Sequence, residues 1–186
     1  MTVSISDVSL CNQALAKVNG KRITSLTDSS ESARKCNEVF YDLLEQDLVY
    51  THWNFATKRV ALAQLTDAPP FGWTYQYQLP TDYLEMVKEY NEAEYKIEGK
   101  RLLSNEGTIQ IVYIYGVTDM SLLSAAFRKA FVFRLAAHLA MPIANSKDMA
   151  MKYEDLAEKY MSRAAAKDGQ ADTPDDRSDG DWVTDR

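Results

Sequence analysis

The stretch "HWNFATKR", His52 to Arg59, marks the point where the sequence pattern changes from helical to extended. Before it, apolar residues recur every three or four positions; after it, apolar residues tend to alternate with polar ones and turn-forming residues become frequent. We therefore expect a helical segment to end here and a β region to begin. Trp53 and Phe55 are suited to anchor this structural corner, with Asn54 bonding the irregular backbone between them.

Two amphipathic helices are expected before the corner. The first has Ser6 as its N-cap and Gly20 at the left-handed position that often follows a helix. In the second, Asp28 and Glu31 have capping-box spacing, and the apolar stripe predicts a helix that continues to about residue 50.

Residues 60–117 are predicted to form a small antiparallel sheet with mostly local connections. Trp73, Tyr75 and Tyr77 alternate with polar residues, which is typical of a half-buried strand. Residues 108–117 also alternate, and turn formers separate the short extended segments. The β region is thus an insertion between helical segments.

Helical periodicity returns at residues 120–141, where apolar residues occupy nearly all sides. Such a helix lies at the centre of a bundle or is buried in an oligomer. We expect Ser121 or Asp119 to cap it and Pro142 to end it. A last amphipathic helix, capped by Asn145, should pack against it.

The C-terminal residues 168–186 have the composition of an extended arm. They contain seven aspartates and two arginines, and too few apolar residues to build a core. Trp182 and Val183 are the exceptions, and such residues often become anchors when an arm orders on a partner.

The predicted fold class is therefore α+β. An antiparallel helical bundle comes from residues 1–59 and 118–167, a small antiparallel β region is inserted at residues 60–117, and an acidic C-terminal arm follows at residues 168–186.

The sequence offers no pattern for catalysis or for a cofactor. It contains no phosphate-binding glycine loop, no nucleophile elbow and no metal-ligand spacing, so we expect neither a metal nor a cofactor. Cys11 and Cys36 fall on apolar stripes and are expected to be reduced and buried. His138, on the apolar helix, is expected to be buried or at an interface. No signal peptide or membrane span is predicted, which favours folding in a cytoplasm.

Two other functions remain open at this point. One is a small cytosolic enzyme with a site around His52 and the aromatic strand. The other is a nucleic-acid-binding module that uses Lys58, Arg59 and the aromatic residues. The formal net charge of −6 disfavours a broad basic face for nucleic acid.

An ordered set of segments resembles a known family. The set comprises "CNQALAKVNGKRITSLTD", "SARKCNEVFYDLL", "HWNFATKRVALA", "PPFGWTYQYQLPTDYL", "YKIEGKRLL" and "FRKAFVFRLAAHLA". Together these segments, within residues 8–165, resemble the tail tubular protein A type of head-to-tail adaptor from short-tailed bacteriophages. The acidic arm is the part of the chain that matches least.

The resemblance implies a structural virion protein without catalysis. Such adaptors form a twelvefold ring below the portal protein, extend the DNA channel and receive the tail nozzle protein, and a C-terminal arm embraces the portal. Under this hypothesis, Trp182 and Val183 are the portal-binding residues of the arm. Genomic DNA passes through the channel without sequence-specific binding, and assembly takes place in the host cytoplasm with no membrane involved.

A ring also needs contacts between its subunits. The apolar helix at residues 120–141 could supply more burial than one small bundle uses. Its residues Phe127, Phe131 and Arg134 are the candidates for the oligomer interface.

Overall fold

A computed structural model describes residues 5–171 of the 186-residue chain. The predicted arm residues Trp182 and Val183 lie outside the described residues. The helices are α1 (Asp7–Lys17), α2 (Glu31–Leu48), α3 (Ala125–Ala144) and α4 (Lys147–Gly169), with a short 3₁₀ helix η1 (Asn54–Ala56). The strands are β1 (Thr57–Ala61), β2 (Ala63–Gln64), β3 (Tyr75–Gln78), β4 (Tyr83–Glu89), β5 (Tyr95–Glu98), β6 (Arg101–Ser104) and β7 (Gln110–Tyr115).

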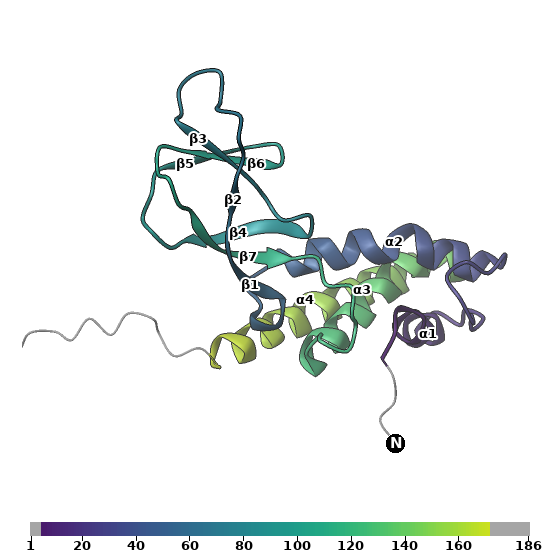
Figure 1. Cartoon of the computed structure of the whole chain (residues 1–186). Coiled ribbons are helices and arrows are strands. Elements are labelled where there is room, and N and C mark those ends of the chain that lie inside the picture. The colour runs from purple at the N-terminus through teal and green to yellow at the C-terminus, as the bar shows by residue number, and fades with distance from the viewer. Residues whose placement is uncertain (1–4, 172–186) are drawn as a thin grey trace, which may run out of the picture.

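The predicted α+β class is confirmed. The four helices form one body, and the strands between α2 and α3 stand on one side of it (Figure 1). Helix α3 contacts α1, α2 and α4, and α3 and α4 form a closely packed pair. The nearly all-apolar surface of α3 is therefore explained by its central place within one subunit.

The β region contains two antiparallel sheets, whereas a single sheet was predicted. One has the strand order β1-β7-β4 and the other the order β2-β3-β6-β5. The chain crosses from the first sheet to the second at Leu62, whose N–H donates to the Ile109 carbonyl at 2.9 Å. Strands β1 and β7, the first and last of the insertion in sequence, pair antiparallel and close it with a non-local contact.

Strand β7 connects the two cores of the molecule. Ile109, which precedes it, and the side chains of Ile111 and Tyr113 belong to the apolar cluster of the β region. Ile114, on the other face, belongs to the large cluster of the helical bundle and is 0% exposed. The predicted alternation is correct, and both faces of the strand are buried.

The aromatic strand differs from its prediction. Strand β3 begins at Tyr75, so Trp73 precedes it, and the interleaved Gln76 is buried. The Gln76 amide donates to the Asp67 carbonyl at 2.7 Å and accepts from Arg101 at 2.9 Å. These bonds satisfy both ends of a side chain that the alternating pattern had placed in solvent.

The first helix begins as predicted but ends differently. Ser6 caps α1 in a capping box with Ser9. The left-handed residue after α1 is Asn19, with φ 55°, and not Gly20. Gly20 instead permits close packing, because a Cβ atom there would lie 2.7 Å from Leu15 Cδ2.

The caps of the later helices were also assigned to the wrong residues. Ser30 caps α2, while Asp28 accepts bonds from the backbone of Thr24 and Ser25, which lowers the pKa of Asp28. Ser124 caps α3 and Ser146 caps α4.

The end of α3 was placed three residues too early. Pro142 lies inside the helix, and Asn145 ends it in the left-handed conformation with φ 48°. A proline interrupts a helix through the missing N–H, and the helix here continues for only two further residues.

Both cysteines are buried and free, as predicted. They lie on α1 and α2, and a hydrogen bond between the two thiols, together with burial, raises the pKa of Cys11. Neither thiol is exposed to solvent, so both are core residues.

Candidate functional site: the junction of the bundle and the β region

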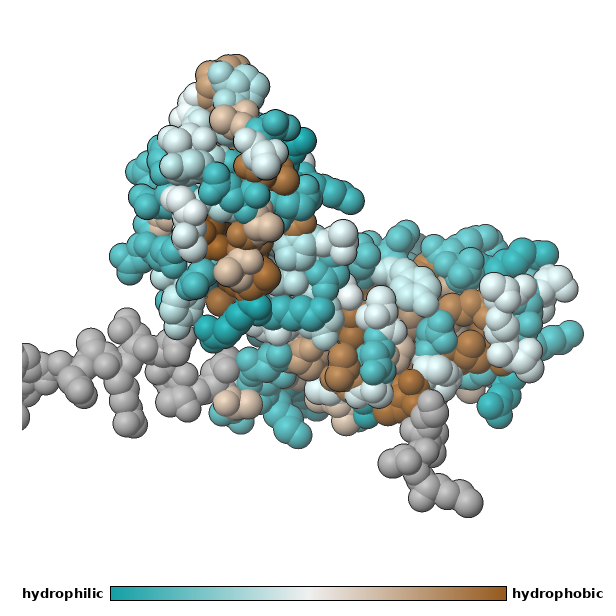
Figure 2. All heavy atoms as spheres, viewed as in Figure 1, coloured by the Kyte–Doolittle hydropathy of each residue, from teal (hydrophilic) through white to brown (hydrophobic). Residues whose placement is uncertain are grey.

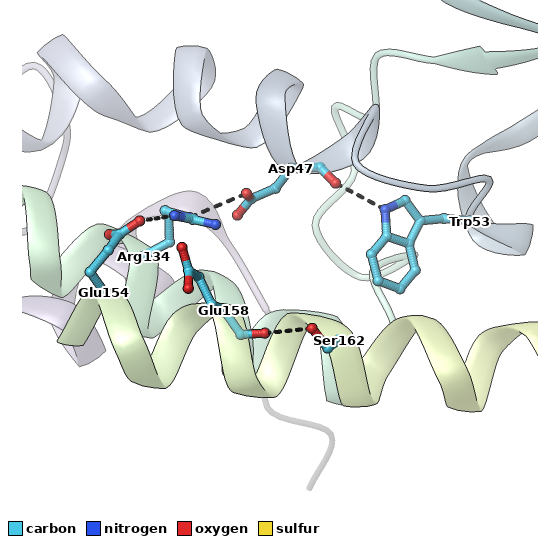
Figure 3. A network of polar contacts seen from close by, with 6 residues as sticks. All are labelled: Asp47, Trp53, Arg134, Glu154, Glu158 and Ser162. Carbon is cyan, nitrogen blue, oxygen red and sulfur yellow. Dashed lines mark hydrogen bonds and ion pairs between the residues drawn. The ribbon is translucent and has the colours of Figure 1, made fainter. Parts of the chain in front are cut away.

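Trp53 is the central residue of the junction between the bundle and the β region. Its side chain is 0% exposed, and its indole N–H donates to the Asp47 carbonyl at 2.9 Å, near the end of α2 (Figure 3). This bond satisfies the only polar group of the indole in an otherwise apolar setting. The tryptophan thereby fixes the direction in which the chain leaves α2.

Aromatic rings extend from Trp53 into the bundle. Its ring stacks on Phe55 with centroids 5.6 Å apart and meets the edge of Phe127 at 5.0 Å. Phe127 in turn stacks on Phe131 at 6.0 Å, and Phe131 meets Phe40 of α2 at 5.3 Å. The corner is therefore continuous with the core of the bundle.

Phe127 and Phe131 are core residues of one subunit. Both are 0% exposed, so neither has surface to offer a second subunit, which corrects their expected place at an oligomer interface. Within residues 5–171, the large exposed apolar side chains lie elsewhere, on helices, on strand β5 and on loops: Tyr41, Val49, Tyr50, Phe71, Tyr90, Tyr95, Leu122, Met141 and Met151.

Asn54 joins the junction to the end of α4. Its backbone N–H donates to Asp168 Oδ2 at 2.7 Å, and its side-chain amide donates to the Asp168 carbonyl at 3.1 Å. Sequence reasoning expected Asn54 to bond the local backbone and assigned Asp168 to the arm. Asp168 instead lies in the last turn of α4 and closes the bundle against the start of η1.

Arg134 forms ion pairs with two acids from neighbouring helices. Its Nε atom lies 3.3 Å from Asp47 Oδ1 of α2, and its Nη1 donates to Glu154 of α4. Figure 3 shows this guanidinium between the two carboxylates. The Arg134 side chain is only 16% exposed, so most of it already serves contacts within the subunit.

Asp47, the more deeply buried acid of this cluster, has a raised pKa, which favours its neutral form. Burial raises the pKa of Asp47 to about 6, although Arg134 beside it acts in the opposite direction. One oxygen of Asp47 has no hydrogen-bond partner among the described residues. The charged carboxylate is therefore poorly solvated, and ionisation of Asp47 costs folding free energy.

A second polar cluster surrounds Lys58 on the β side of the junction. Its ammonium lies 2.7 Å from Asp82 Oδ2 and 3.7 Å from the centre of the Tyr115 ring. Asp82 also accepts from the Tyr113 hydroxyl at 3.0 Å. Burial alone would raise the pKa of Asp82, but the bonds from Lys58 and Tyr113 outweigh it and lower the pKa.

The histidines lie apart from these clusters. His52 and His138 are both exposed, so of the two places expected for His138, burial in the subunit is wrong and an interface between subunits stays a prediction. Among residues 5–171, neither forms a hydrogen bond or an ion pair, and no group of acids, cysteines and histidines has a metal-binding arrangement. Within the same range, no helix is long and apolar enough to cross a membrane.

Comparison with protein-family models and with curated proteins finds no match for this chain. The role of the junction is therefore inferred from its geometry. The polar groups of the junction pair with each other across helices, and such pairing positions elements of a fold.

Sequence reasoning found Trp53 and Phe55 and also named Arg134, but it placed Arg134 at an oligomer interface and missed its buried partner Asp47. Asp47 stands among the apolar residues of the α2 stripe, between Leu44 and Leu48, and Arg134 stands between Phe133 and Leu135 in α3. An acid and a base that interrupt two apolar faces are a signal for a buried pair.

The contribution of Trp53 to the free energy of unfolding can be measured. We expect Trp53→Ala to lower the free energy of unfolding by about 3–5 kcal/mol, because it removes a fully buried ring and its bond to Asp47. Urea unfolding at one pH checks this value. Trp73→Ala is the control and should cost clearly less, since Trp73 is partly exposed; equal losses would contradict the central place of Trp53.

The raised pKa of Asp47 predicts a pH effect. Its folded value of about 6 exceeds the ordinary 3.8, so the folded state holds this proton more tightly than the unfolded chain does. The contribution of the group to stability is therefore greatest below the unfolded value and is lost as pH rises to about 6. Relative to Asp47→Asn, the wild type should lose up to about 3 kcal/mol across this window.

Urea unfolding of both proteins at several pH values tests this effect. Asp42→Asn, which changes an exposed acid on the same helix, is the control and should follow the wild type. A stability difference between wild type and Asp47→Asn that stays constant, or that grows in favour of the wild type as pH rises, would contradict the raised pKa of Asp47.

Proposed function

We propose that this chain is a structural virion protein of a short-tailed bacteriophage. It acts as a head-to-tail adaptor that forms a ring below the portal protein, extends the DNA channel and provides the platform for the tail nozzle protein. The ring contains twelve copies, as the resemblance to tail tubular protein A implies. Neither catalysis nor a cofactor is part of this function.

The observation that carries the proposal is the order of the architecture. Helices α1 and α2 and helices α3 and α4 build one bundle, although the whole β region separates them in sequence. The same order, with a bundle interrupted by a β insertion, is what the family resemblance implies. The segments that carry the resemblance include the corner at Trp53 and the central helix α3.

The junction has the character of a structural joint. Trp53, Arg134 and Lys58 each hold elements together through bonds that are made within the described part of the chain. His52 is exposed and lacks an orienting acid there, which gives the enzyme hypothesis no support. Lys58 is paired with Asp82, which weakens the case for a nucleic-acid contact at this point.

The charge of the chain suits a DNA channel. A net charge of −6 opposes tight binding to phosphates, and DNA has to slide through an adaptor ring during packaging and ejection. Because Phe127 and Phe131 are buried, the ring contacts are assigned to exposed apolar residues of helix ends and loops, such as Tyr50, Leu122 and Met151.

Portal binding and the role of the arm can be tested in one experiment. The full chain and a variant that ends at residue 171 are each mixed with the portal protein of the same virus and analysed by sedimentation velocity. We expect the full chain to sediment with the portal and the shortened chain to attach much more weakly while keeping its helical circular dichroism. The shortened chain retains Asp168, whose bonds to Asn54 belong to the folded core.

Two outcomes would count against the proposal. If the full chain does not sediment with the portal, the adaptor function is wrong. If the shortened chain binds as well as the full chain, the acidic arm and its residues Trp182 and Val183 are not the portal-binding element.

A further inference from the structure

A groove runs between α1 and the first half of α3. It has a volume of about 590 Å³, and residues of both helices line it, with Ile5 at one end. Its apolar floor includes Leu10, Val132 and Phe133. Figure 2 shows hydrophobic surface on this side of the bundle, near α1. The groove is the largest of the hollows described on this chain and lies away from the junction at Trp53.

The charged residues of the groove all carry the same sign. Lys17, Arg128 and Lys129 line it, and none of its lining residues is acidic. Within residues 5–171, none of these three cations forms an ion pair. Lys17 lies 4.4 Å from the centre of the Phe133 ring and Lys129 lies 4.0 Å from that of Tyr160, contacts that hold both ammonium groups beside the groove.

An apolar floor beside three cations that have no acidic partner within residues 5–171 fits a specific kind of peptide, although Arg128 also donates to the Leu123 carbonyl. The ligand should be acidic, to pair with the cations, and should carry an apolar side chain for the floor. Residues 172–186 of this chain have both properties: they contain six aspartates, two arginines and the apolar pair Trp182 and Val183. Aspartates stand on both sides of that pair, at Asp181 and Asp185.

We infer that the groove between α1 and α3 binds the acidic segment 172–186 of the same chain. Trp182 and Val183 cover the apolar floor, and the flanking aspartates pair with Lys17, Arg128 and Lys129. This inference concerns the free subunit and does not depend on the proposed function. If the adaptor function holds, the portal competes with the groove for the same segment.

The length of the segment allows it to return to its own groove. Tyr160, which contacts Lys129 of the groove, lies nine residues before the end of α4 at Gly169, and nine helical residues span about 14 Å. Trp182 is the eleventh residue after Ala171, and an extended chain of eleven residues spans about 36 Å. The reach therefore exceeds the distance back along α4 by a wide margin.

Charge also distinguishes residues 172–186 from the N-terminal residues 1–4 as ligands for the groove. Residues 1–4, "MTVS", directly precede Ile5 at the edge of the groove. They contain no acidic residue and would leave all three cations without partners. The acidic segment is therefore the better ligand for this surface.

A spin label on the segment tests the inference in the full chain. Thr184→Cys introduces one thiol into the segment, and the native Cys11 and Cys36 are 0% exposed and therefore protected from a nitroxide reagent. In a dilute, low-salt, ¹⁵N-labelled sample, we expect the backbone amide signals of groove residues such as Lys17, Lys129 and Val132 to be broadened. The signals should return when the nitroxide is reduced.

Charge reversal separates specific docking from general attraction. Lys17→Glu combined with Lys129→Glu should abolish the broadening of the groove signals. The control pair, Lys152→Glu with Lys159→Glu, changes net charge equally on exposed positions of α4 and should keep the broadening. The dispersion of the amide signals in each variant verifies that the bundle remains folded.

Several results would overturn the inference. These are unbroadened groove signals in the otherwise wild-type sample, broadening confined to another surface, and broadening that survives reversal of Lys17 and Lys129. The last test mixes two proteins: one carries the nitroxide but no ¹⁵N, and the other carries ¹⁵N but no nitroxide. Groove broadening that appears as strongly in this mixture would assign the groove to the segment of a second copy.

Discussion

The structure depends on the burial of one side chain, Trp53, where the helical bundle meets the β region. Its indole N–H holds the end of α2 through the Asp47 carbonyl, and its ring packs against Phe127 of α3 and Phe55 of η1. Elements far apart in sequence are thereby fixed at one point. Strand β1 follows η1 directly and pairs with β7. This pairing places the end of the β region next to the bundle, where α3 begins.

The ion cluster beside Trp53 adds specificity to this packing. Arg134 of α3 pairs with Asp47 of α2 and Glu154 of α4, so three helices share one guanidinium. Buried ion pairs contribute little net stability, because desolvation offsets most of the attraction. Their effect is to disfavour other arrangements of helices whose remaining contacts are apolar and interchangeable. A bundle completed by two separate chain segments has particular need of such a constraint.

Much of the fold could be predicted from periodicity, whereas the residues that end its elements could not. The spacing of apolar residues indicated four helices, the inserted strands and the corner at Trp53, because burial repeats along each element. Ser30, Ser124 and Ser146 were missed as caps because several polar residues compete at each helix start and tertiary packing selects among them. The division into two sheets and the bond between Asn54 and Asp168 depend on long-range contacts, which local patterns do not encode.

We propose that this subunit is a component of a ring and not a catalyst. Electron cryomicroscopy of the chain mixed with the portal protein of its proposed virus is the decisive experiment. We expect a closed twelvefold ring of this chain below the portal, with the bundle and β region of each subunit joined at Trp53 as in the free chain. A complex that contains isolated copies without a closed ring would contradict this proposal.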